Sequence, residues 1–428
     1  MTNPAGKTFG SLAVPNFRRF VAGQVVSATG TWMMVVAQDW LVLSLSHNDP
    51  TALATVTALQ FTPLLLLTLY GGRLADRHDK RRLLVAANLT SAGLAAVLAV
   101  LAAAGSVRVW HLYGPALALG VVNAVEVPTR MAFVSELVGP ELLPNASSLS
   151  AAYFNTARIV GPALAGLLIA GLGIAPVFAL NAVSYLATVA ALLRMDPALL
   201  HRGSRAVRQG GTLDGLRYLR ARPDLALVLA LVAVIGLFGF NFQLTLPLLA
   251  RTVFHTGASA FGLLTAAVAV GSLAGAFATA RRRTRPALRL VVVTALAFGA
   301  LETAAGLAAS YAVAALLLAL TGAATTCFTQ AANHRIQLGC DPEYRGRVLA
   351  VYTLILQGST PLGVLAVGWF TQALGARAGL WGAGLVCLTA TALLPLTARP
   401  RRPAPAAPGG DGRHRTSGER HVSQFPVK

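Results

Sequence analysis

The sequence predicts an all-α membrane protein with twelve transmembrane helices in two pseudo-symmetric six-helix bundles. The first observation is composition: 55% of the 428 residues are hydrophobic and 12% are charged, whereas a soluble protein carries about 25% charged residues. The second is that apolar residues occur in runs of roughly 20, the length that crosses the hydrocarbon core of a bilayer. The third is that cations concentrate in alternate loops between these runs. Helix is required because unpaired backbone groups cannot face lipid.

Twelve apolar runs define the expected helices in order along the chain. The expected spans are 18–43, 51–72, 83–104, 110–131, 146–170, 174–194, 223–248, 258–280, 287–308, 311–333, 347–371 and 378–397. The longest internal connection divides them six and six. The predicted units are an N-terminal bundle (1–195), a cytoplasmic connecting loop (196–222), a C-terminal bundle (223–398) and a disordered basic cytoplasmic tail (399–428). Within the connection, 213–222 has the composition of a short amphipathic helix at the membrane surface.

A faint internal repeat supports the division into two bundles. Pro128-Thr129-Arg130 at the end of span four recurs as Asn333-His334-Arg335 at the end of span ten. The segment 72–77 closing span two has an echo in 275–281 closing span eight, which keeps the glycine and the basic loop but lacks the acid. Both shifts are about 200 residues, as expected for two duplicated six-helix bundles that face each other.

The distribution of cations predicts the topology. If the N-terminus lies inside, thirty-one of the 35 Lys and Arg residues fall in cytoplasmic segments. The external loops hold Arg108, Arg251 and Arg377, and Arg158 falls within a span. An error of one in the span count would move every later loop to the opposite side of the membrane, and the concentration of cations on one side would be lost. We therefore expect a multi-pass protein of the cell (plasma) membrane with both termini in the cytoplasm.

Several functional classes find no support in the sequence. The net charge of +20 would indicate nucleic acid in a soluble chain, but here the cations sit in loops, where they set topology. The three cysteines have no metal-ligand spacing, so no metal site is expected. Gly6-Lys7-Thr8 matches only the end of a phosphate loop and follows no strand, so an ATP-driven pump is not supported. The prediction is neither an enzyme nor a nucleic-acid-binding protein.

The segment 72–83, between the second and third spans, carries the most specific motif. Its pattern Gly72-x-Leu-Ala-Asp76-Arg77 with the following basic residues closely resembles the corresponding loop of the major facilitator superfamily of secondary transporters. Asp79 departs from the pattern, because that family usually has Gly there. The segment 155–166 is similar to the bacterial exporter branch that includes siderophore and drug efflux proteins. The resemblance implies alternating access, in which two bundles rock about a central site, and a monomer.

The resemblance also implies a cytoplasmic gate. The matching Asp in the family locks the inner gate against a helix N-terminus, where the partial positive charge of the helix favours a carboxylate. The first turn of span eleven is the expected partner of Asp76, with Arg130 as a cationic neighbour. The alternative is that these loop charges only fix topology. The expected gate residues are Gly72, Asp76, Arg77, Arg81, Arg130 and Arg347.

Span five carries a second motif. Gly161-Pro162 with Gly166 resembles the exporters' motif, although Ala165 replaces one of its glycines. Proline bends a helix and small residues let another helix approach closely. Arg158 precedes this group in the same span. The link of the motif to export rests on the resemblance, and the alternative is ordinary close packing.

Ionisable groups inside a bilayer are costly unless paired or hydrated, so they are candidates for function. Asp39, Glu126 and Glu302 are the candidates for proton coupling. Asp39 could instead reach water at the external end of its span. Glu126 lies four residues before Arg130, a spacing that allows a structural ion pair on one helix face. Arg158 is expected to pair with an acid from another helix, and Glu126 is the chosen partner.

Polar residues on spans one, four, seven and ten are candidates for contacts with substrate, since the resemblance places these spans around the cavity. Each could equally form a hydrogen bond between helices. The predicted function is a secondary active transporter, with proton-coupled efflux of a drug, antibiotic, other metabolite or siderophore, powered by the proton gradient without a cofactor. Import of a small solute and a non-transporting membrane sensor remain alternatives. The candidate cavity residues are Gln24, Asn123, Asn241, Gln243, Gln330 and Asn333.

Overall fold

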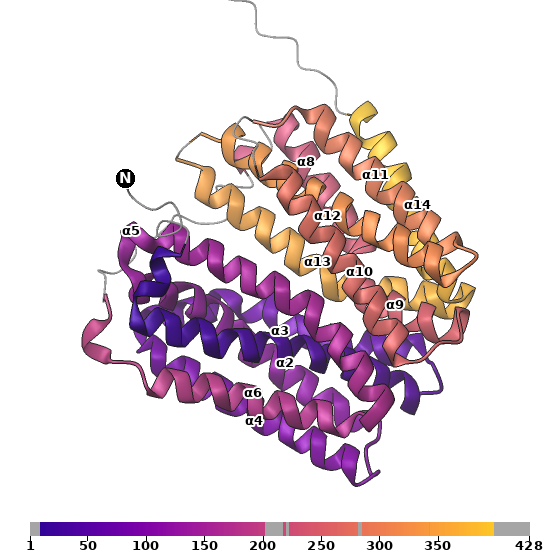
Figure 1. The fold of residues 1–428 in the computed structure, drawn as a ribbon. Coiled ribbons are helices and arrows are strands. Elements are labelled where there is room, and N and C mark those ends of the chain that lie inside the picture. The colour runs from indigo at the N-terminus through magenta and orange to yellow at the C-terminus, as the bar shows by residue number, and fades with distance from the viewer. Residues whose placement is uncertain (1–8, 202–216, 220–221, 281–284, 342, 398–428) are drawn as a thin grey trace, which may run out of the picture.

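The computed structural model describes residues 9–201, 217–219, 222–280, 285–341 and 343–397. The regular structure of these residues is helical, and the helices form two groups, one from each half of the chain (Figure 1). The predicted tail (399–428) and much of the connecting loop lie outside the described residues. Of the amphipathic helix predicted at 213–222, the structure describes helical backbone at 217–219.

The first half contains five long helices that provide six membrane spans. Its longest helix, α5, has 63 residues and contains a break at Gly139, where φ is 71° and ψ is 174°. Pro140 follows, so the chain turns back there and α5 supplies both the fourth and the fifth span. The helices are α2 (Pro15–Leu45), α3 (Pro50–Arg77), α4 (Lys80–Ala103), α5 (Trp110–Leu172) and α6 (Ala175–Leu193).

The second half supplies spans seven to twelve. Its first span differs from the predicted continuous helix at 223–248, because π-helical turns at Ile235–Gly239 and Leu249–Val253 interrupt it. Phe240 and Asn241 lie between the first π turn and α9. The helices are α8 (Pro223–Val234), α9 (Phe242–Leu248), α10 (Ala258–Thr279), α11 (Leu288–Leu307), α12 (Tyr311–Gly339), α13 (Arg345–Leu374) and α14 (Ala376–Thr397).

The number of predicted spans is confirmed. Among the described residues, 11 helices are long and apolar enough to cross a membrane. One of these is α5, and its break at Gly139 turns 11 helices into twelve spans. The segment 132–145, expected as a loop, is instead largely helical. Phe133 and Leu137 are fully buried there in a cluster with Phe17 and Phe20, which explains why the helix continues beyond the apolar run.

The helices alternate in direction, so their connections gather at two ends of the molecule. The arginine-rich end carries Lys80, Arg81, Arg82, Arg194, Arg222 and Arg285, whereas the arginine-poor end carries the turns at 46–49, 254–257 and 308–310. At the arginine-rich end, the Asp79 carboxylate accepts a hydrogen bond from the backbone N–H of Arg82 and so caps α4. At the arginine-poor end, Asp49 caps α3 in the same way through Thr51.

The two halves pack through two related pairs of helices, α3 with α13 and α5 with α10. These are spans two with eleven and five with eight, which a two-fold exchange of the halves interconverts. The α5–α10 contact brings backbones together: a Cβ at Gly166 would lie 2.8 Å from the carbonyl oxygen of Ala258, and one at Gly262 would collide with the carbonyl oxygen of Pro162. Close approach of small residues is how helices gain packing energy in lipid.

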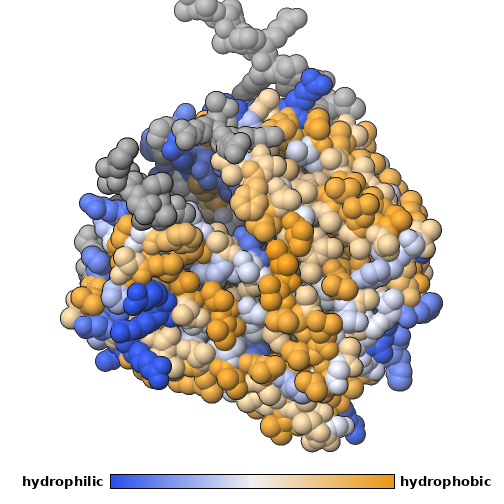
Figure 2. Space-filling view, viewed as in Figure 1, coloured by the Kyte–Doolittle hydropathy of each residue, from blue (hydrophilic) through white to orange (hydrophobic). Residues whose placement is uncertain are grey.

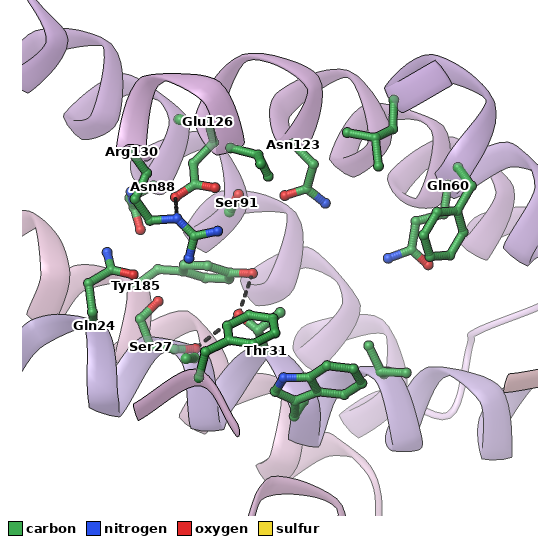
Figure 3. Close-up of a pocket in the computed structure, with 18 of the residues that line it drawn as sticks. Gln24, Ser27, Thr31, Gln60, Asn88, Ser91, Asn123, Glu126, Arg130 and Tyr185 are labelled. Atoms are coloured by element: carbon green, nitrogen blue, oxygen red, sulfur yellow. Dashed lines mark hydrogen bonds and ion pairs between the residues drawn. The ribbon is translucent and has the colours of Figure 1, made fainter. Parts of the chain in front are cut away.

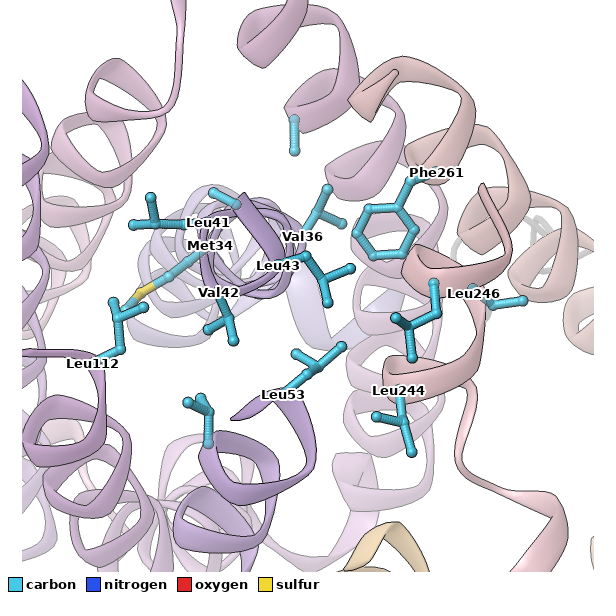
Figure 4. Packing of buried hydrophobic residues seen from close by; sticks show 14 of the residues in the cluster. Met34, Val36, Leu41, Val42, Leu43, Leu53, Leu112, Leu244, Leu246 and Phe261 are labelled. Carbon is cyan, nitrogen blue, oxygen red and sulfur yellow. The ribbon is translucent and has the colours of Figure 1, made fainter. Parts of the chain in front are cut away.

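The halves are joined most tightly at the arginine-poor end. A cluster of fully or nearly fully buried side chains there includes Leu43 and Leu53 from the first half and Leu244 and Phe261 from the second (Figure 4). The outer surface is apolar over most of the face in Figure 2. Leu69, Phe277 and Trp369 are each more than 70% exposed, as expected for side chains that meet lipid rather than water.

Replacing Gly271 tests the close helix packing. A Cβ at Gly271 on α10 would collide with the carbonyl oxygen of Ala319 on α12. We therefore expect Gly271→Ala to destabilise the folded protein by about 1–3 kcal/mol through overpacking. Thermal unfolding in detergent measures the change.

The matched control is Gly93→Ala on α4, where a Cβ would meet nothing within 4 Å. The control should unfold at the same temperature as the parent or slightly higher, because alanine favours helix over glycine. Equal unfolding temperatures for both variants would contradict the packing assigned to α10 and α12.

Candidate functional site: a polar cavity in the first half

A cavity of about 340 Å³ lies among the helices of the first half. Helices α2, α3, α4, α5 and α6 contribute to its wall, and Gln243 on α9 reaches it from the second half. Trp32, Phe61 and Phe154 give it aromatic surface. Its polar groups are mostly amides and hydroxyls: Gln24, Ser27, Thr31, Gln60, Asn88, Ser91, Asn123, Tyr185 and Gln243.

One ion pair lies in the cavity wall. The Glu126 carboxylate lies 3.4 Å from Nε of Arg130, one turn along α5, with 16% and 21% of the two side chains exposed. Figure 3 shows Glu126 and Asn123 on one wall and Gln24, Ser27 and Thr31 of α2 on the opposite wall. The Thr31 hydroxyl lies 3.2 Å from that of Tyr185 and donates to the carbonyl oxygen of Ser27. The ion pair that the spacing of Glu126 and Arg130 allows is present in this conformation.

Three of the six predicted cavity residues line this cavity and three do not. Gln24, Asn123 and Gln243 lie in its wall. The amide of Asn241 instead donates to the carbonyl oxygens of Leu237 and Phe238, at 2.8 and 3.0 Å, and its side chain is buried in the broken span. On α12, Asn333 accepts a hydrogen bond from Gln337, and neither Asn333 nor Gln330 belongs to this wall.

Several cavity residues were not predicted. Gln60 on α3, Asn88 and Ser91 on α4 and Tyr185 on α6 all lie in the wall. Their spans were not among those expected to surround the cavity. The signal in the sequence was their polarity within otherwise apolar runs, and the spacing of Asn88 and Ser91, which places both on one face of α4.

The other two intramembrane acids are sealed from the cavity and from solvent. Asp39 is 3% exposed and Glu302 is 1% exposed, and one carboxylate oxygen of each is buried without a hydrogen-bond partner. The alternative that Asp39 simply reaches water is therefore wrong for this conformation. Ala28, Trp32 and Val35 line the cavity from α2, and Asp39 lies one turn beyond Val35 on the same helix face, toward the arginine-poor end.

The expected ion pair between Arg158 and Glu126 is not formed. The Arg158 guanidinium lies 5.8 Å from the centre of the Trp32 ring, a cation–π contact, and no acid within the described residues bridges it. Glu126 is already paired along its own helix, because Arg130 is one turn away. Arg158 therefore contacts an aromatic residue of the cavity wall and does not pair with Glu126.

The other motif residues in α5 lie at helix contacts. A Cβ at Gly161 would lie 2.6 Å from Cβ of Trp32 and 2.9 Å from the carbonyl oxygen of Thr29, both on α2. Pro162 and Gly166 contact α10, as described above. The motif therefore lies between the cavity helix α2 and the second half of the chain.

The residues expected to form a gate are not assembled in this conformation. Asp76 and Arg77 are exposed at the end of α3, and within the described part of the chain no partner is seen for the Asp76 carboxylate. A Cβ at Gly72 would meet nothing within 4 Å. Arg81 donates to the carbonyl oxygens of Leu192 and Leu193, both at 2.7 Å, and so holds α4 to the end of α6.

For Arg347 the structure shows a contact with an aromatic ring. Arg347 lies in the first turn of α13, and its guanidinium lies 5.4 Å from the centre of the Tyr344 ring. Arg130 pairs with Glu126 in the cavity rather than with Asp76. The gating role of these residues stays a prediction.

The membrane-spanning helices and the family match together define a multi-pass membrane transporter rather than an enzyme. The chain belongs to the MFS_3 family of transmembrane secretion effectors, within the major facilitator superfamily, and the family match covers residues 6–407. The resemblance inferred from the motif at 72–83 is confirmed.

The chain is also similar to individual transporters. Multidrug efflux pump Tap of Mycolicibacterium fortuitum is 26% identical over 368 residues, covering 83% of this chain and 88% of that protein. Macrolide efflux protein A of Streptococcus pyogenes is 23% identical, covering 83% and 89%. The staphyloferrin A transporter of Staphylococcus aureus is 27% identical over 257 residues, which are 59% of this chain and 64% of that protein.

Among solved structures, a bacterial homologue of the lysosomal transporter Spinster, in an inward-facing and unoccupied conformation, superposes with a TM-score of 0.72. It is 13% identical, and the match covers 90% of this chain and 97% of that one. The D-xylose–proton symporter has a TM-score of 0.67 at 14% identity. These likenesses establish the fold, and the predicted fold class is confirmed.

Thiol labelling tests which side chains the cavity exposes. In a variant whose native cysteines are replaced, Asn123→Cys should react with a small water-soluble thiol reagent, because Asn123 lies in the cavity wall. Ala54→Cys should stay unreactive, because Ala54 is 1% exposed at the contact with α13. The ratio of the labelling rates in detergent is the measurement. A faster reaction at position 54 than at position 123 would contradict the closure of the arginine-poor end.

Proposed function

We propose that this chain exports a small organic compound across the cell membrane by alternating access, driven by the proton gradient. The observation that carries the proposal is the cavity, in which amides, hydroxyls and aromatic rings surround a single ion pair. Such a wall suits a moderately apolar compound with several hydrogen-bonding groups, because the two charged side chains that line it, Glu126 and Arg130, are paired with each other. Drugs, antibiotics, other metabolites and siderophores fit this description.

The contacts between the halves support alternating access. The two halves are packed closely at the arginine-poor end, through α5 with α10 and α3 with α13. At the arginine-rich end, the Asp76 carboxylate is exposed without a partner in the described chain. We take this conformation as open toward the arginine-rich end. The docking of Asp76 on the start of α13 would then belong to the opposite conformation, where a helix N-terminus can hold a carboxylate.

The direction of export is supported by relatives and by the motif in α5. Two of the similar proteins are efflux proteins by name, the Tap pump and macrolide efflux protein A. The motif residues Gly161, Pro162 and Gly166 lie where the cavity helix α2 and the second half meet α5. Transport assays in both directions would separate export from import and from a non-transporting sensor.

Glu126 is the acid best placed to couple protons to transport. Its carboxylate lies in the cavity wall and is partly exposed, whereas Asp39 and Glu302 are sealed. A carboxylate that is accessible from one side of the membrane in one conformation, and from the other side after the halves have moved, can carry a proton across the membrane. Pairing with Arg130 in one state and protonation in the other would make that exchange depend on conformation. Asp39, beyond the closed end of the cavity, is the second candidate.

Neutralising the acids tests the coupling. In vesicles with an imposed pH gradient, Glu126→Gln should abolish the gradient-driven part of efflux to the level of vesicles without protein, because the variant cannot exchange a proton. Exchange of labelled for unlabelled substrate without a gradient should persist, since rocking needs no net proton transfer. Glu302→Gln serves as the control, since Glu302 lies on α11 away from the cavity wall.

Asp39→Asn completes the series. If both Glu126→Gln and Asp39→Asn keep the full response to the pH gradient, proton coupling through these acids is wrong. The substrate for the assay comes from a panel of antibiotics and siderophores screened in cells that lack or overproduce the protein.

We further propose that the arginine-rich end faces the cytoplasm, because cations are retained on that side. A cysteine at Lys80 should be protected from an impermeant thiol reagent added to intact cells, whereas a cysteine at Ser106 should be labelled. Lys80 is the first residue of α4 and Ser106 lies in the connection that follows this helix, so the two positions are at its opposite ends. Labelling at position 80 with protection at position 106 would reverse the topology.

A further inference from the structure

Arg251 joins the two halves of the molecule at the arginine-poor end. It lies on the π-helical turn Leu249–Val253 in the second half. Its Nη1 donates a hydrogen bond of 2.6 Å to the hydroxyl oxygen of Ser44, near the end of α2 in the first half. Its guanidinium carbon lies 4.9 Å from the centre of the Trp40 ring, one turn earlier on α2. One side chain thus makes a polar and an aromatic contact across the boundary.

The contact surface extends to α10 of the second half. The Trp40 ring is stacked on the ring of Phe261, with centroids 6.3 Å apart and planes 16° from parallel. Phe261 is 2% exposed and belongs to the cluster that packs the two halves together. The Ser44 hydroxyl donates to the carbonyl oxygen of Trp40, which leaves its oxygen oriented toward Arg251. Trp40 is therefore held between an arginine and a phenylalanine from the opposite half.

These contacts lie directly beyond the sealed end of the cavity. Val35 lines the cavity, and Trp40 and Ser44 follow it along α2 toward the arginine-poor end. Any opening at that end has to move the end of α2 away from α9, the π turn and α10. Such a movement breaks the hydrogen bond and separates the indole from both of its partners.

We propose that Arg251, Ser44 and Trp40, with Phe261 beneath, form the lock that keeps the arginine-poor end closed in this conformation. The lock needs no acid, because a guanidinium binds a hydroxyl oxygen and an aromatic face without an ion pair. The proposal requires that the arginine-poor end opens at some stage. It does not require export, proton coupling or any particular substrate.

Arg377 provides a matched control at the same end. Like Arg251 it contacts an aromatic ring, with its guanidinium 5.8 Å from the centre of Phe254, and it donates to the carbonyl oxygens of Gly306 and Ala308. All three partners belong to the second half. Removing the Arg377 charge therefore disturbs one half without releasing the other.

Distance measurement between spin labels tests the lock without a substrate. Labels at Ser106→Cys and Ala309→Cys occupy exposed turns of the first and second halves at the arginine-poor end. The background replaces Cys327, Cys340 and Cys387, of which the last two are buried. Pulsed electron paramagnetic resonance in lipid nanodiscs then reports how often the two halves stand apart.

Loss of one charged hydrogen bond and one cation–π contact should raise the ratio of open to closed molecules about tenfold or more. Arg251→Gln should therefore add or enlarge a long-distance population. Ser44→Ala should produce a smaller change, because the contact with Trp40 remains. Arg377→Gln should reproduce the parent distribution.

An unchanged distribution in Arg251→Gln, with normal thermal unfolding, would overturn the lock. So would an equal shift in Arg377→Gln, because the effect would then come from loss of positive charge at this end. Trp40→Leu gives a second test from the other half, and it should shift the same equilibrium in the same direction as Arg251→Gln.

Discussion

The arrangement of this molecule depends on helices that touch backbone to backbone. In lipid the apolar side chains gain little by leaving one hydrocarbon environment for another, so helices associate where small residues allow close approach. Gly262 meets the carbonyl of Pro162 at the boundary between halves, and Gly271 meets Ala319 within the second half. These contacts fix the boundary between the halves and the interior of the second half, whereas the helices of the first half carry polar groups around a cavity.

Much of the fold could be predicted because lipid imposes a simple rule on the backbone. Apolar runs long enough to span the membrane must be helical, and all twelve were recognised from length alone. The helical stretch at Phe133 and Leu137 was missed because its buried residues are mixed with polar ones. The breaks in span seven were also missed. The residues Ile235–Gly239 contain no local sequence signal for a π turn. The hydrogen bonds of such a turn depend on how the neighbouring helices pack.

The site was predicted only in part, for a different reason. The sequence shows which spans contain polar residues, but the side that each residue faces depends on the rotation of its helix. Asn123 and Asn241 look equivalent as amides in apolar spans, yet one lines the cavity and the other satisfies backbone carbonyls at a helix break. The pair of Glu126 and Arg130 was predictable because both belong to one helix. The partner of Arg158 required knowledge of the packing between helices, and the structure places an indole there rather than an acid.

The cavity wall belongs almost entirely to one half of the molecule, with Gln243 as the contribution of the other. A compound bound there would therefore keep most of its contacts with the first half when the two halves move relative to each other. Gln243 lies on the seven-residue helix α9, which follows one π-helical turn and precedes another. If this cavity binds the transported compound, substitutions in the first half would change which compounds are recognised, while the sequence of the second half could stay unchanged.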